Sequence, residues 1–219
     1  RSLLLDDLVP ALGARGIHLL RFAELTALQK SWLADYFHRL VFPVLTPLAF
    51  DPSHPFPHIS NLSLNLAVVI QDREDGELFA RVKVPEVLPR LVPLPPELVP
   101  LPQAASDDTA PAAEAPVEPP VATSTGRRYA FVWLEEVIAA QLGVLFPGME
   151  VVESYPFRVT RNVDVEIQED EAGDLLRTIE QGVRQRRFGE AVRLQVDAAM
   201  PDRIRQLLVK SPVVRIVEV

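Results

Sequence analysis

The chain has 219 residues, of which 48% are hydrophobic and 24% charged, a composition typical of a globular protein with a sizeable core. It contains no cysteine, which excludes disulfides, thiolate metal sites and cysteine nucleophiles. The formal net charge of -8 argues against a general nucleic-acid-binding protein, because affinity for phosphate backbones comes from clustered Lys and Arg. Since no apolar run approaches the ~20 residues that span a bilayer, we expect a cytoplasmic protein without a membrane span.

The first 41 residues predict the last helices of a helical domain. An apolar stripe from Leu4 to Leu12 predicts a helix that a proline must interrupt, and the letters GIHLLR after it predict a short extended link. A second amphipathic helix is predicted from Thr26 and is stopped by Pro43. Because the chain begins at Arg1 inside an apolar-periodic stretch, we expect it to be a fragment of a longer protein.

The stretch FPVLTPLAFDPSHPFPH, which begins at Phe42, concentrates five prolines and two histidines. We interpret it as a rigid joint between the helices and the following sheet, because each proline presets its own φ. Prolines separate and flank His54 and His58, so their spacing of four does not give the shared helical face of a metal pair, and a structural role is favoured. The residues assigned to this joint are Pro43, Pro47, Asp51, Pro55, Phe56 and Pro57.

Two alternating apolar segments follow the corner. SLNLAVVI and LFARVKV predict a β-hairpin with Asp75 and Gly76 in its turn. From about residue 102 to 127 the chain is rich in Ala, Pro and acidic residues, with no aromatic side chain. Such a composition cannot bury enough apolar surface to offset its ordering entropy, so a flexible insertion is predicted.

The last third predicts alternating helices and strands. A helix is expected from Tyr129 to near Gly143, two extended pieces over residues 151–167, and a helix over 169–189. A strand, a short helix with Pro201 in its first turn and a closing strand complete the chain. The predicted fold class is therefore α+β: a helical segment (residues 1–41), then a head domain (42–219) in which helices pack on a mixed sheet.

Few residues in this pattern carry recognisable chemistry. Arg158 and Arg161 stand in an alternating polar segment and are weak candidates for an anion site, against the commoner reading of a solvated sheet face. The basic letters RQRR at residues 184–187 fit the end of a helix that begins with acids, as the helix dipole favours. There is no Walker loop, no HExxH and no GxSxG, so we assign no catalytic and no metal-binding residue.

Several segments together resemble one enzyme family. VFPVLTPLAFDPSHPFPHISNLSLNLAVVI, ARVKVPEVLPRLVPLP, YAFVWLEEVIAAQLGVLFPGMEV and SYPFRVTRNVDVEI are similar to segments of bacterial polyphosphate kinases of the first family. The resemblance covers nearly the whole chain, from the end of the N-terminal helical domain through the head domain. The acidic, Pro- and Ala-rich stretch at about residues 103–126 departs from it by its length.

The resemblance implies a parent enzyme that transfers the terminal phosphate of ATP reversibly to polyphosphate through a phosphohistidine. It places that histidine, with the residues for ATP and Mg²⁺, beyond Val219. The present chain then holds no cofactor and is a non-catalytic scaffold and dimerisation portion. Its expected partners are the C-terminal catalytic domains of the same protein and a second copy in a homo-oligomer, with polyphosphate and ATP reached through the parent.

Two alternatives stay open. The chain could bind a polyanion or a nucleotide by itself through Arg158, Arg161 and the basic residues at 184–187. It could also be a stand-alone protein-interaction domain whose acidic insertion recruits a partner.

Overall fold

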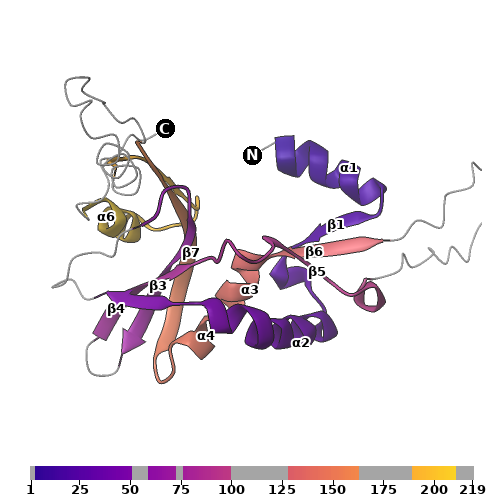
Figure 1. Cartoon of the computed structure of the whole chain (residues 1–219), viewed down its shortest axis with the longest axis horizontal. Helices are drawn as coiled ribbons and strands as arrows, with labels where there is room; N and C mark the ends of the chain where they lie inside the picture. The colour runs from indigo at the N-terminus through magenta and orange to yellow at the C-terminus, as the bar shows by residue number, and fades with distance from the viewer. Residues whose placement is uncertain (1–2, 51–58, 73–75, 100–127, 163–188, 211–219) are drawn as a thin grey trace, which may run out of the picture. The chain divides into compact units, whose positions relative to one another are not determined.

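The computed structural model describes residues 3–50, 59–72, 76–99, 128–162 and 189–210 (Figure 1). The chain divides into two compact units, residues 1–35 with 89–137 and residues 36–88 with 138–219. This division by compactness joins the N-terminal segment to a later stretch of chain. The expected domain boundary between residues 41 and 42 stays a prediction.

The first unit is built on a three-stranded mixed sheet with the order β1-β6-β5. β1 (Ile17–Leu20) pairs in parallel with β6 (Tyr129–Trp133), and β5 (Leu91–Pro93) pairs antiparallel with the other side of β6. Its helical segments are η1 (Leu3–Leu8), α1 (Val9–Ala14), η2 (Phe22–Glu24) and η5 (Pro96–Leu98). Two longer helices, α2 (Ala27–Tyr36) and α3 (Leu134–Ala140), cross the division between the units.

The extended conformation predicted for GIHLLR is confirmed in strand β1, although its pairing in a sheet was not predicted. One prediction for this unit was wrong: the predicted helix from Tyr129 begins only at Leu134. Residues 129–133 alternate instead, with Ala130 and Val132 buried while Tyr129 is 48% exposed. Period two and aromatic, β-branched residues favour a strand, and the helix-like spacing of later apolar residues masked this signal.

The second unit contains a five-stranded sheet with the order β2-β4-β3-β7-β8, all of whose neighbouring pairs are antiparallel. The predicted hairpin is confirmed in β3 and β4, and Gly76 has a φ of 78°, a left-handed conformation that suits glycine. The predicted pair of extended pieces is one continuous strand, β7, up to Arg161. The strands are β2 (Pro47–Phe50), β3 (Leu64–Asp72), β4 (Gly76–Lys83), β7 (Glu150–Arg161) and β8 (Ala191–Val196).

Strand β3 lies at the centre of this sheet and is buried on both faces. Its residues 66–70 are each at most 1% exposed. On one face, Ala67 and Val69 belong to a cluster with Ile204 and Leu208 of α6 (Asp202–Lys210), which lies beside the sheet in Figure 1. Ile204 and Leu208 are four residues apart and therefore lie on one face of α6. The short helix predicted here is confirmed, and Pro201 directly precedes it instead of lying in its first turn.

The remaining helical segments of this unit are η3 (Phe37–Val41), η4 (Phe42–Val44) and α4 (Leu142–Leu145). The helix predicted from Thr26 is confirmed: α2 continues into η3, and η4, which contains Pro43, ends it before β2 begins at Pro47. The α+β class is therefore confirmed, with one mixed and one antiparallel sheet.

Several predicted features lie outside the described residues: Asp51, His54, Pro55, Phe56, Pro57 and His58 of the proline corner, the insertion at 102–127, the helix at 169–189 with its basic residues, and the closing strand.

A tight turn leads into β3. Ser63 donates its backbone N–H to Ser60 O at 3.3 Å, and Leu62 donates to Val159 O at 2.8 Å. Leu62 has a φ of 59°, a left-handed conformation that costs a residue with a Cβ ~1–2 kcal/mol. Its side chain is 56% exposed, so burial compensates little of that cost.

We therefore predict that Leu62→Gly raises the free energy of unfolding by ~0.5–1 kcal/mol, because glycine adopts the turn without strain. Gly76→Ala is the matched opposite: nothing lies within 4 Å of an added Cβ, so its cost of ~1 kcal/mol is purely conformational. Urea unfolding of the three proteins measures both shifts. A loss of stability in Leu62→Gly as large as that in Gly76→Ala would contradict the strain at Leu62.

Candidate functional site

Arg161, one of the two predicted anion-site residues, is buried at the end of β7, with only 5% of the residue exposed. Its Nε donates to Ile59 O at 2.7 Å and its Nη1 donates to Gly189 O at 2.8 Å. Its backbone N–H donates to Asn61 Oδ1 at 2.7 Å. One residue thus ties the turn before β3, the end of β7 and the segment before β8 together.

The environment of this guanidinium is unfavourable for charge. Desolvation by burial lowers the pKa of Arg161 from its ordinary value. The two carbonyl oxygens direct their negative ends at the cation and satisfy Nε and Nη1, so an anion cannot take these two positions. Nη2 is buried and has no hydrogen-bond partner among the described residues.

Arg158 lies elsewhere on the same strand. In an extended strand residues three apart face opposite sides, and Phe157 and Val159 alternate with Arg158 in burial. The register shift near Arg161 leaves this alternation intact, because the extra residue of the bulge belongs to β8. The structure therefore does not bring Arg158 and Arg161 together on one ligand.

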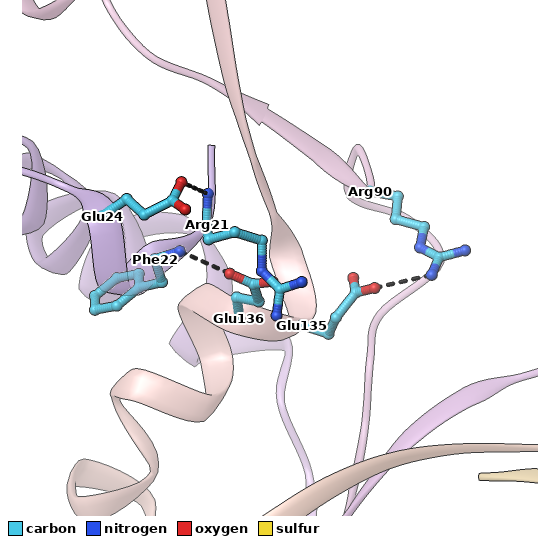
Figure 2. A network of polar contacts seen from close by, with 6 residues as sticks. All are labelled: Arg21, Phe22, Glu24, Arg90, Glu135 and Glu136. Carbon is cyan, nitrogen blue, oxygen red and sulfur yellow. Dashed lines mark hydrogen bonds and ion pairs between the residues drawn. The ribbon is translucent and has the colours of Figure 1, made fainter. Parts of the chain in front are cut away.

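A second polar cluster, missed by the sequence analysis, lies at the start of α3 (Figure 2). The Glu136 carboxylate uses both oxygens: Oε1 pairs with Arg21 Nε at 2.8 Å, and Oε2 accepts the Phe22 N–H at 2.7 Å. Glu24 Oε2 accepts the Arg21 N–H at 3.3 Å. Glu136 thereby fixes the chain after β1 against the first turn of α3.

Glu135, the neighbouring acid, holds a different segment. Its Oε1 accepts Arg90 Nη2 at 2.8 Å, and the Arg90 guanidinium lies 5.2 Å from the centroid of the Trp133 ring. The cation therefore meets both a carboxylate and an aromatic face. Figure 2 shows Arg21 and Arg90 approaching the two glutamates from separate segments. Two adjacent acids after a strand-like run, in the letters WLEEV, are the signal that sequence reasoning could have used.

A third polar group joins α6 to its sheet. Arg203 Nη1 lies 2.6 Å from Glu77 Oε1 on β4, and the second terminal nitrogen of Arg203 pairs with Glu153 on β7. Tyr155 donates its hydroxyl to Glu153 Oε2 at 2.8 Å. This group orients α6 across two strands.

Taken together, these clusters pair charges with charges or with backbone groups. They can orient segments of chain, and the one hydroxyl among them, that of Tyr155, donates to a glutamate that is also paired with Arg203. His38 is exposed, makes an edge contact with the Phe37 ring and lies tilted against the Phe42 ring. Among the described residues, no group of three or more His, Cys, Asp or Glu side chains could hold a metal ion. No helix in the part that the structure describes is long and apolar enough to cross a membrane.

Comparison with known proteins identifies the family. The family model described as the polyphosphate kinase middle domain matches residues 28–215. This chain belongs to the polyphosphate kinase middle-domain family. The resemblance inferred from the sequence is thereby confirmed.

Two curated relatives and one solved structure show the extent of the match. The chain is 48% identical to polyphosphate kinase 1 of Chlorobaculum tepidum over 95% of its own length and 27% of that protein. It is 47% identical to a polyphosphate kinase of Aphanizomenon baltica, over 94% of this chain and 49% of that protein. The crystal structure of polyphosphate kinase from Porphyromonas gingivalis matches with a TM-score of 0.66 and 25% identity, over 99% of this chain and 27% of that one. The chain thus spans about a quarter to a half of these relatives.

For this middle domain we predict that Arg161→Met lowers the free energy of unfolding by ~2–4 kcal/mol, because two carbonyls lose their donor. Arg158→Met, the same substitution on the opposite face of β7, should cost less than ~1 kcal/mol. Chemical denaturation of both variants gives the comparison. Equal losses would mean that Arg161 is not the tie between the three segments.

In the cluster at the start of α3, Glu136→Ala should lower the free energy of unfolding by ~1–2 kcal/mol, because it leaves both the Phe22 N–H and Arg21 without their acceptor. Arg21→Ala should cost at most ~1 kcal/mol, since its side chain is 62% exposed and its ion pair is screened. Thermal unfolding at low and at 1 M salt separates the two: the effect of Arg21→Ala should fade in salt, while the part of the Glu136→Ala effect that comes from the Phe22 N–H should remain. The reverse order of costs would contradict this account.

Proposed function

We propose that this chain is a non-catalytic scaffold domain of a polyphosphate kinase. The parent enzyme transfers the terminal phosphate of ATP reversibly to polyphosphate, and its phosphohistidine lies in a segment C-terminal to Val219. The observation that carries the proposal is the match of residues 28–215 to a domain described as the middle one of that enzyme family. ATP and Mg²⁺ belong to the parent, as does assembly into a homo-oligomer in the cytoplasm.

The geometry supports a framework role. Charged side chains in the described residues tie segments together: Arg161 to two carbonyls, Glu136 to Arg21 and Phe22, and Arg203 to two strands. Rigid positioning of this kind is what a domain offers to catalytic neighbours. A polyanion-binding role gains no support from Arg158 and Arg161, which face opposite sides of β7.

The test is transfer of labelled γ-phosphate from ATP with Mg²⁺, using the 219-residue chain and the full-length polypeptide in parallel. We expect labelled polyphosphate and acid-labile phosphohistidine from the full-length polypeptide alone. Clear transfer by the 219-residue chain would overturn the proposal. Single substitutions of His18, His38, His54 and His58 by Gln would then identify the reacting side chain.

A further inference from the structure

Four large apolar side chains are exposed in the segment that leaves the α2–η3 helix in the second unit, and this set is called the ridge. It consists of Leu40, Phe42, Val44 and Leu48, which are 51%, 41%, 45% and 38% exposed. Residues 40–48 contain no charged side chain, in a chain of which 24% is charged. Depletion of charge around large apolar side chains is characteristic of the core of a protein–protein interface.

The ridge is held in place by the fold. The Phe42 ring makes an edge contact with the buried Phe37 ring at 6.1 Å and lies 6.3 Å from His38. Leu45 donates its N–H to Phe42 O at 3.2 Å, and Leu48 pairs with Arg81 across β2 and β4. The Phe42 ring and the backbone at Leu45 and Leu48 are therefore already ordered before a partner binds, which lowers the entropy lost on binding.

A partner is expected to contact the ridge through side chains and not by adding a strand to the sheet. β2 is an edge strand of the five-stranded sheet, where an added strand could in principle pair. Pro47 opens β2 and has no N–H to donate, which is a usual protection of an edge against another strand. Strand addition by a second copy is therefore disfavoured, while an apolar surface can still cover the ridge.

We infer that the ridge docks against an apolar, uncharged surface of a neighbouring domain in the same polypeptide. The matched family describes this part as a middle domain, and the chain covers only 27% of the Chlorobaculum relative. A middle domain has neighbours at both ends within one chain, so the effective concentration of such a surface is high. This inference rests on the proposed function, in that it takes the chain to be part of a full-length polyphosphate kinase.

The experiment uses cysteine labelling, which suits a chain without cysteine. Leu40→Cys and Phe42→Cys place a thiol on the ridge, and Val87→Cys, at a position 81% exposed in the same unit, is the matched control. Each variant is made in the 219-residue chain and in the full-length polypeptide. Maleimide labelling is followed by mass spectrometry of the peptide that carries the new thiol, over a range of protein concentrations.

We expect both ridge thiols to react readily in the 219-residue chain, and at least about tenfold more slowly relative to the control in the full-length polypeptide. A ratio of ridge to control labelling that is the same in both proteins would overturn the inference. Protection in the 219-residue chain that grows with its concentration would overturn it too, in favour of a second copy. Kinase assays on the same full-length variants distinguish this inference from the proposed function. An active enzyme with a reactive ridge refutes the docking of the ridge alone. A protected ridge in an inactive protein refutes the proposed function alone.

Discussion

Burial of β3 on both faces is the constraint on which the larger unit depends. A strand whose side chains alternate between two apolar layers must have a hydrogen-bonded neighbour on each side, and β4 and β7 are those neighbours. A slip of one residue would exchange the two layers and move Asn65, which is buried and donates its Nδ2 to Ser63 O at 2.9 Å, to the opposite face. The register of the neighbouring strands, the β3–β4 hairpin and the packing of α6 on the sheet all depend on this one buried strand.

Polar contacts hold together segments of the chain that the apolar core does not fix. Arg161 is a charged side chain in a desolvated site, and it is tolerated because backbone carbonyls satisfy two of its nitrogens. Its position at the end of β7 joins segments that are far apart in the sequence. The paired acids of α3 do the same in the other unit, each with its own arginine. Several charged side chains among the described residues of both units hold segments together, and this supports the proposal that the domain is a framework.

The sequence predicted well those elements that show a clear local pattern of apolar residues, bounded by a turn or a proline. The hairpin, the α2–η3 helix, β8 and α6 all have this property. It missed the pairing of β1 and the strand β6, because these short strands pair with partners that are distant in the sequence. The polar sites were harder to predict from the sequence than the helices and strands. Arg161 was read as a potential ligand-binding residue because alternation gives the face of a side chain, but it does not reveal that Ile59 and Gly189 present carbonyls to it. Glu135 and Glu136 went unnoticed, since their arginines come from residues 21 and 90.

The central claim is that the charged groups of this domain act within the fold and do not bind the substrates of the enzyme. The most direct measurement is the thermal unfolding of the 219-residue chain titrated with ATP and Mg²⁺, and separately with sodium polyphosphate of defined length. A ligand at 100 times its Kd stabilises a folded protein by ~2.7 kcal/mol, so specific binding would be plain in the midpoint. The account predicts no saturable rise with either ligand. A saturable rise that falls with salt and disappears in Arg158→Ala would contradict it.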